Sequence, residues 1–191
     1  MKNLIVFIFG ALLILGSSKF VYAQQYGDFY IGGNGILKCE DAPPGETTDI
    51  EGVTYTAVAD RATLKTMIGD GIDPLNVCTT HVTEMNSLFF YKSAFNQDIG
   101  NWDVSKVTNM SDMFFGAEAF DQDIGKWDVS KVINMDKMFN TARVFNQDIG
   151  NWDVSQVTNM DNMFVGATVF NQDVSFCCVS KIGSSPTGFS P

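Results

Sequence analysis

The sequence predicts an α/β solenoid, in which 25-residue coils follow an N-terminal cap made of strands and a helix. One near-identical segment occurs three times, as FNQDIGNWDVSKVTNM at 95–110, FDQDIGKWDVSKVINM at 120–135 and FNQDIGNWDVSQVTNM at 145–160. No residue is inserted or lost between the copies. A gap-free period of this length is typical of proteins in which each repeat buries its apolar residues against its neighbours.

The period falls within the 20–29 residues of leucine-rich repeats. Within the first copy, Ile99, Trp102 and Val104 have the LxxLxL spacing of a short strand, and apolar and polar residues alternate there. Asn109 is a candidate cap for a short helix or 3₁₀ turn that reaches Phe114. Each coil is therefore expected to hold one short parallel strand and one short helix or 3₁₀ turn. The general crossover rule makes the expected solenoid right-handed.

Residues 1–23 read as a secretory signal peptide. Lys2 precedes an apolar run at 4–15 that is too short to span a bilayer, and Ala23 ends a small-residue cleavage site. We expect cleavage near Ala23 and a secreted or cell-surface protein with no transmembrane segment in the mature chain.

The remaining sequence divides into three parts. Residues 24–76 are expected to form the N-terminal cap, with a β-hairpin from strands at 36–42 and 53–58 and a helix at 61–68 that Asp60 caps. The repeat solenoid covers 77–182, where the pattern weakens towards its end. Residues 183–191 carry no repeat and read as a tail.

Export favours disulfides among the four cysteines. Three pairings can be drawn, but a bond between the neighbours Cys177 and Cys178 would close a strained ring. Cys39 and Cys78 are the preferred bridge, which would join the cap to the first coil. The partners of Cys177 and Cys178 stay open.

The string W-D-V-S-x-V-x-N-M-x-x-M-F, complete in all three copies, resembles the repeat of BspA-like leucine-rich-repeat surface proteins. It is similar above all to a 25-residue variant first described as a domain of unknown function in mycoplasma surface lipoproteins. The resemblance covers about 76–182. It implies an exported, non-enzymatic module with adhesive or binding roles.

The LxxLxL geometry places nine polar residues on the concave strand face, which makes them candidate ligand contacts. They are Asn101, Asp103, Ser105, Lys126, Asp128, Ser130, Asn151, Asp153 and Ser155. Three aspartates in one column would repel one another. Either the column binds a cation, a basic group or a hydroxyl-rich ligand, or Lys106 and Lys131 neutralise it and the serines donate hydrogen bonds.

Composition narrows the function classes. The chain has 22 acidic against 12 basic residues, and losing residues 1–23 removes two lysines and no acid, so nucleic acid is not an expected partner. The sequence has a single histidine, His81, and no CxxC pair, so it predicts neither a metal site nor a catalytic triad. It also has no glycine-rich loop of the kind that binds phosphate. We expect no enzyme and no cofactor, although Ca²⁺ stays open because of the aspartates.

The sequence therefore predicts an exported, non-catalytic binding or adhesion module that engages a protein or glycan at the cell surface or in the extracellular matrix. The alternatives are a structural spacer, a truncated fragment of a larger adhesin, or an accessory module for polysaccharide processing.

Overall fold

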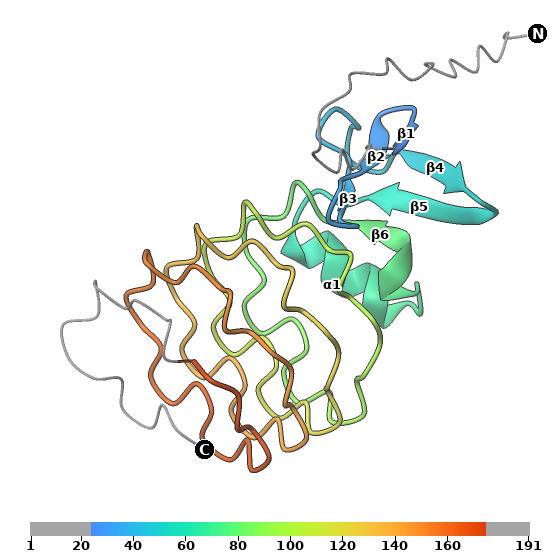
Figure 1. Ribbon diagram of the computed structural model, residues 1–191. Helices are drawn as coiled ribbons and strands as arrows, with labels where there is room; N and C mark the ends of the chain where they lie inside the picture. The colour runs from blue at the N-terminus through green and yellow to red at the C-terminus, as the bar shows by residue number, and fades with distance from the viewer. Residues whose placement is uncertain (1–23, 175–191) are drawn as a thin grey trace, which may run out of the picture.

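A computed structural model of the chain describes residues 24–174. Its regular secondary structure lies in the first part of that range, in two small three-stranded sheets, one α-helix and one 3₁₀-helix (Figure 1). The strands are β1 (Gln24–Tyr26), β2 (Phe29–Ile31), β3 (Leu37–Lys38), β4 (Thr47–Ile50), β5 (Val53–Ala57) and β6 (Val77–Cys78). The helices are α1 (Arg61–Gly69) and η1 (Pro74–Asn76).

The two sheets differ in their topology. The first is an antiparallel meander in the order β1-β2-β3, and the second has the order β4-β5-β6, with β4 and β5 antiparallel and β5 and β6 parallel. The two strands expected at 36–42 and 53–58 do not pair with each other. The first shortens to β3 and pairs with β2, and the second, as β5, pairs with β4.

Helix α1 begins where the sequence predicts it. The Asp60 side chain accepts a hydrogen bond from the Thr63 backbone N–H at 2.8 Å, which satisfies one of the unpaired donors of the first turn. Leu64 is fully buried and joins the main apolar core, while the rest of the helix is exposed or half-buried. The helix thus covers the first copy of the repeat with one narrow face.

The predicted fold class, a leucine-rich-repeat solenoid, is wrong. Over residues 79–174 the described chain contains no strand and no helix, only turns, irregular segments and isolated parallel bridges, and the regular structure is that of a small α/β protein. The LxxLxL segment is not a strand, and the segment after Asn109 is not a helix. No concave strand face therefore exists to carry the nine candidate residues.

Asparagine and aspartate side chains explain this difference. In the first copy the carboxylate or amide oxygens of Asp98, Asp103 and Asn109 each accept a hydrogen bond from the backbone N–H two residues later. Such turns compete with both helix and sheet hydrogen bonding. Asp112 and Gly116 add two residues with positive φ, a conformation that interrupts either regular structure.

Consecutive copies are joined by backbone hydrogen bonds between like positions. The N–H of Met85 donates to Asn109 at 2.9 Å, that of Met110 to Asn134 at 2.9 Å, and that of Met135 to Asn159 at 2.8 Å. Further backbone hydrogen bonds of this kind occur at every second residue after Met85, from Ser87 to Ser111 and from Phe89 to Met113. In Figure 1 the successive copies lie side by side.

The tryptophan indoles add bonds between copies. The indole Nε1 of Trp127 donates to the Ile99 carbonyl at 3.2 Å, and that of Trp152 donates to the Ile124 carbonyl at 3.2 Å. All three repeat tryptophans are buried, as the sequence predicts. The first of them, Trp102, makes the equivalent bond to the carbonyl of Pro74 in η1 at 2.8 Å, since Pro74 lies one period before Ile99.

A covalent bond and a backbone hydrogen bond are among the links that tie the end of the first sheet to the chain that follows. A disulfide joins Cys39 to Cys78, which confirms the predicted bridge, and the Leu37 N–H donates to the Asn101 carbonyl at 3.0 Å. Cys177 and Cys178, whose partners the sequence leaves open, lie outside the described residues.

We expect Gly125→Ala to destabilise the protein by about 1–3 kcal/mol, because its Cβ would lie 2.6 Å from the Asp148 carbonyl oxygen of the next copy. Gly69→Ala is the matched control: nothing lies within 4 Å of its Cβ, and alanine favours the helix. Urea unfolding of the three proteins checks this. Equal stability of the Gly125→Ala and Gly69→Ala variants would contradict it.

Replacing both Cys39 and Cys78 by alanine should lower the free energy of unfolding by about 2–4 kcal/mol, since the bridge closes a loop with a sequence separation of 39 residues. The measurement is denaturant unfolding with and without a reductant. The reductant should destabilise the wild-type protein and leave the double variant unchanged; the variant also controls for the remaining cysteines. A reductant effect of the same size on both proteins would show that this bridge contributes little.

Candidate functional site

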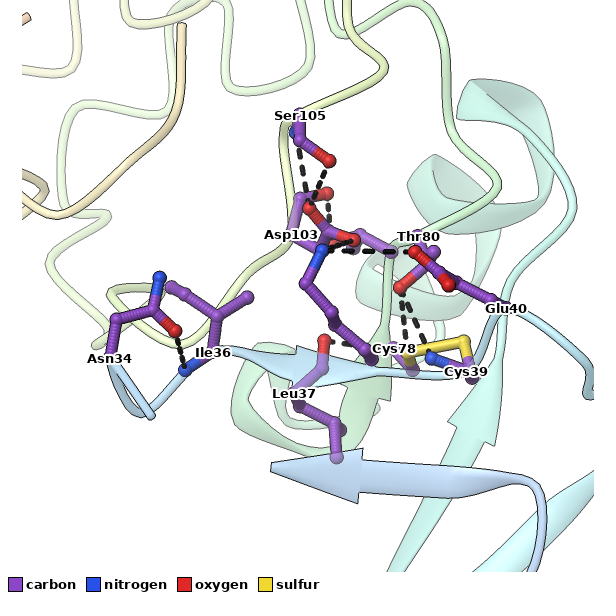
Figure 2. Close-up of polar contacts among 11 residues, drawn as sticks. Asn34, Ile36, Leu37, Cys39, Glu40, Cys78, Thr80, Asp103 and Ser105 are labelled. Carbon is purple, nitrogen blue, oxygen red and sulfur yellow. Dashed lines mark hydrogen bonds and ion pairs between the residues drawn. A yellow bond between two sulfur atoms is a disulfide. The ribbon is translucent and has the colours of Figure 1, made fainter. Parts of the chain in front are cut away.

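Asp103 is the most distinctive polar residue of the described chain. Its side chain is only 3% exposed, and its Oδ2 lies 3.0 Å from Nζ of Lys38 in strand β3. Oδ1 accepts hydrogen bonds from the Ser105 backbone N–H at 3.1 Å and from the Ser105 hydroxyl at 2.7 Å. Both carboxylate oxygens are therefore satisfied inside the fold (Figure 2).

These contacts decide the ionisation of the pair. Burial raises the pKa of Asp103, but the hydrogen bonds from Ser105 and Lys38 outweigh it, so its pKa lies below the usual range. Burial lowers the pKa of Lys38, but the hydrogen bond to Asp103 outweighs it and the net shift is upward. Both groups are thus held in their charged forms.

The Cys39–Cys78 disulfide lies beside this ion pair (Figure 2). The hydroxyl of Thr80 accepts a hydrogen bond from the Cys39 N–H at 3.2 Å, and the hydroxyl of Thr79 donates to the Asp103 carbonyl at 3.0 Å. Thr79 and Thr80 are both buried. The bridge and these hydroxyls fix strand β3, and with it Lys38, against the first copy.

The equivalents of Asp103 in the next two copies differ from it. Asp128 and Asp153 are exposed, and each accepts a hydrogen bond from the backbone N–H of the serine two residues later. Hydrogen bonds from Ser155 hold the pKa of Asp153 below its usual value. In the described chain neither carboxylate has an ion-pair partner, and Lys106 and Lys131 form no ion pair with this column.

Two adjoining hollows lie where the β2–β3 loop meets the repeat, and we call them together the junction hollow. Their volumes are about 240 Å³ and 190 Å³, and both are lined by Asn34 and Lys126. The larger is also lined by Gly35, Asp98, Gly100, Asn101 and Asp123. The smaller is also lined by Ile36, Lys38, Trp102, Asp103, Val104, Ser105 and Asp128.

Five of the nine candidate residues line the junction hollow: Asn101, Asp103, Ser105, Lys126 and Asp128. Ser130 donates its hydroxyl to Asp128 at 2.6 Å, and the remaining three, Asn151, Asp153 and Ser155, belong to the following copy and do not line it.

Asn101 combines a satisfied and an unsatisfied group. Its Nδ2 donates to the Leu75 carbonyl at 3.2 Å, whereas its buried Oδ1 has no hydrogen-bond partner within the described residues. A buried acceptor without a partner costs free energy. Among the described residues, Asn101 Oδ1 is thus a buried acceptor of the junction hollow that no other group satisfies.

Sequence reasoning missed Asn34 and Lys38. Lys38 is 65 residues from Asp103 and belongs to a segment without repeats, so no periodicity points to it. One signal could have found it: Cys78 lies 25 residues before Asp103, and the expected bridge brings Cys39, and with it Lys38, to that position.

Two observations concern metals and membranes. Between residues 24 and 174 there is no group of three or more His, Cys, Asp or Glu side chains that could hold a metal ion. In the same range no helix has the length and apolar character needed to cross a bilayer.

The repeat and its junction with the sheets define a modular, turn-rich protein with a polar hollow at one end of its repeat. Residues 62–177 match the family described as mycoplasma proteins of unknown function, DUF285, and the chain belongs to this family. No curated protein and no solved structure shows a significant match to the chain.

Lys38→Met should destabilise the protein by roughly 1.5–3 kcal/mol at pH 7, because it removes a charge-assisted hydrogen bond from a buried carboxylate. The loss should shrink as the pH falls. The lowered pKa of Asp103 gives stability that is present above its unfolded value of about 3.9 and is lost as pH falls through the folded value.

Unfolding measured between pH 3 and pH 7 tests this dependence, with Lys126→Met as the control. Lys126 lines the same hollow but has no ion-pair partner among residues 24–174. A loss of equal size at both ends of the pH range would rule out the ion pair as its cause.

Proposed function

We propose that this chain is an exported, non-catalytic binding module, and that the junction hollow is where it engages a protein or glycan at the cell surface or in the extracellular matrix. The observation that carries this proposal is the convergence of five candidate residues from two copies on the junction hollow, which a loop of the first sheet completes.

The chemistry of the junction hollow suits a hydroxyl-rich ligand. Lys126 supplies N–H donors and Asp128 supplies carboxylate acceptors. Sugar hydroxyls both donate and accept hydrogen bonds, so such a mixed lining can pair with several of them. Binding sites usually have a few such convergent polar groups in a concave surface.

A non-catalytic role agrees with the state of the buried carboxylate. Asp103 is ionised and occupied by Lys38 and Ser105, so neither oxygen is free to accept a proton from a substrate. A general base needs a pKa near the working pH, whereas the pKa of Asp103 is lowered. Its role in the proposal is to hold Lys38 and the β3 strand in place.

Export and surface location are supported by the sequence of residues 1–23, which lie outside the described range. The Cys39–Cys78 disulfide is consistent with an oxidising compartment. The resemblance of the W-D-V-S-x-V-x-N-M repeat to BspA-like surface proteins supports the same location and remains part of this proposal.

Asp128→Ala should weaken ligand binding about tenfold, the effect of losing a hydrogen bond to a charged group. Asp153→Ala should leave it unchanged, because Asp153 makes the same serine contact one copy later but does not line the junction hollow. The measurement is binding of chain 24–191 and both variants to a glycan array and to immobilised matrix proteins. Equal losses in the two variants would place the contact elsewhere, and no binding by the wild-type chain would favour a structural spacer.

A further inference from the structure

Phenylalanine rings form two columns through the described repeat. The inner column contains Phe89, Phe114, Phe139 and Phe164, with ring centroids 5.4, 5.5 and 5.7 Å apart. The outer column contains Phe95, Phe120, Phe145 and Phe170, at 5.8, 5.9 and 5.9 Å. Each inner ring stacks on the outer ring six residues later, with centroids 3.8–4.1 Å apart.

The two columns begin differently. The position one period before Phe89 is Leu64 of α1, which is fully buried and packs in the same core. The position one period before Phe95 is Asp70, the exposed residue that ends α1. The outer column therefore lacks a preceding apolar member. Consistent with this, Phe95 is only partly buried, whereas Phe120 is completely buried.

An open hollow of about 410 Å³ lies at this end of the outer column. Its lining includes Ile68 of α1 and, from the segment that leads into the first copy, Phe89, Tyr91, Lys92, Ala94 and Phe95. We call it the ring hollow. The ring hollow is mostly apolar. A ring inserted into it would contact aliphatic and aromatic side chains, as the rings in the middle of each column do.

A cluster of aromatic side chains adjoins the ring hollow through Tyr91. Phe90 and Tyr91 are 43% and 65% exposed, and with Phe115 they form ring contacts of 4.6–5.2 Å. Exposed aromatic side chains beside a pocket are characteristic of protein–protein contact sites. Lys92 is the one charged residue of the lining, in a chain with 22 acidic and 12 basic residues.

We propose that the ring hollow is a docking site for one aromatic side chain of a partner protein, carried next to a carboxylate. The inserted ring would continue the outer column beyond Phe95, against Ile68 on its other side. Lys92, the charged residue of the lining, would pair with the neighbouring carboxylate of the partner. This site is separate from the junction hollow and does not depend on its function.

The probe is a capped peptide with the sequence Asp-Phe-Asp, titrated against chain 24–191 by calorimetry and by chemical-shift changes. Saturable binding is expected. Substituting leucine for the phenylalanine should weaken it at least fivefold, because leucine cannot stack on Phe95. Substituting lysine for both aspartates should weaken it at least threefold at low salt, because the attraction to Lys92 becomes repulsion.

Ala94→Trp should fill the ring hollow and weaken peptide binding more than tenfold, since Ala94 is an exposed residue of its lining. Val144→Trp is the matched control, an exposed residue at the same repeat position two copies later, and should leave binding unchanged. Neither change removes a buried side chain, so both variants should fold, and their unfolding curves verify it.

Three results would overturn the proposal: no saturable binding of the phenylalanine peptide, equal binding of the leucine peptide, or full binding by the Ala94→Trp variant. Sedimentation of the chain alone supplies a further test. Self-association that Ala94→Trp abolishes would show that a second copy of the chain occupies the ring hollow instead of a partner.

Discussion

Backbone hydrogen bonds between like positions of consecutive copies are the constraint on which the described repeat depends. Each turn-rich copy leaves N–H and C=O groups that its own residues do not satisfy, and the next copy supplies the partners, as Met110 does with Asn134. This pairing fixes the spacing at which the phenylalanine rings meet, 5.4–5.9 Å along each column. It also requires close approach of the backbones, and Gly100 lies so near the Asp123 carbonyl that a Cβ would come within 2.7 Å of it.

The apolar positions of the repeat could be predicted from the sequence, whereas the backbone conformation between them could not. Trp102, Val104 and Met110 are buried as their periodicity indicates, since burial follows from hydrophobicity and position. The same spacing is compatible with strands or with turns. What decides between them is whether side chains such as Asp103 and Asn109 hydrogen-bond to the backbone two residues on, and they do.

In the N-terminal part, too, some elements could be predicted from the sequence and others could not. Local signals were sufficient for helix α1, because Asp60 and the apolar spacing after it act within one helical turn. The strand pairings depend on distant partners, and β3 pairs with β2 through only two residue pairs, too few for a pattern to reveal. The disulfide could be predicted because Cys78 lies one period before Asp103, at the start of the repeat pattern, and Cys39 belongs to a segment expected to form a strand of the cap. Within the candidate site, repetition could point to Asp103, but not to Lys38.

Identical copies produce identical surfaces, so distinctive chemistry can arise only where the repetition is broken. Both hollows lie at such a break, in the first copy. Asp103 has the same sequence context as Asp128 and Asp153, yet it alone of the three is buried and ion-paired, because the β3 strand covers it. Phe95 has the same sequence context as Phe145, but the position one period before Phe145 is a phenylalanine, whereas the position one period before Phe95 is Asp70. The non-repeating sequence before the repeat thus gives the first copy two surfaces that later copies lack, one polar and one apolar.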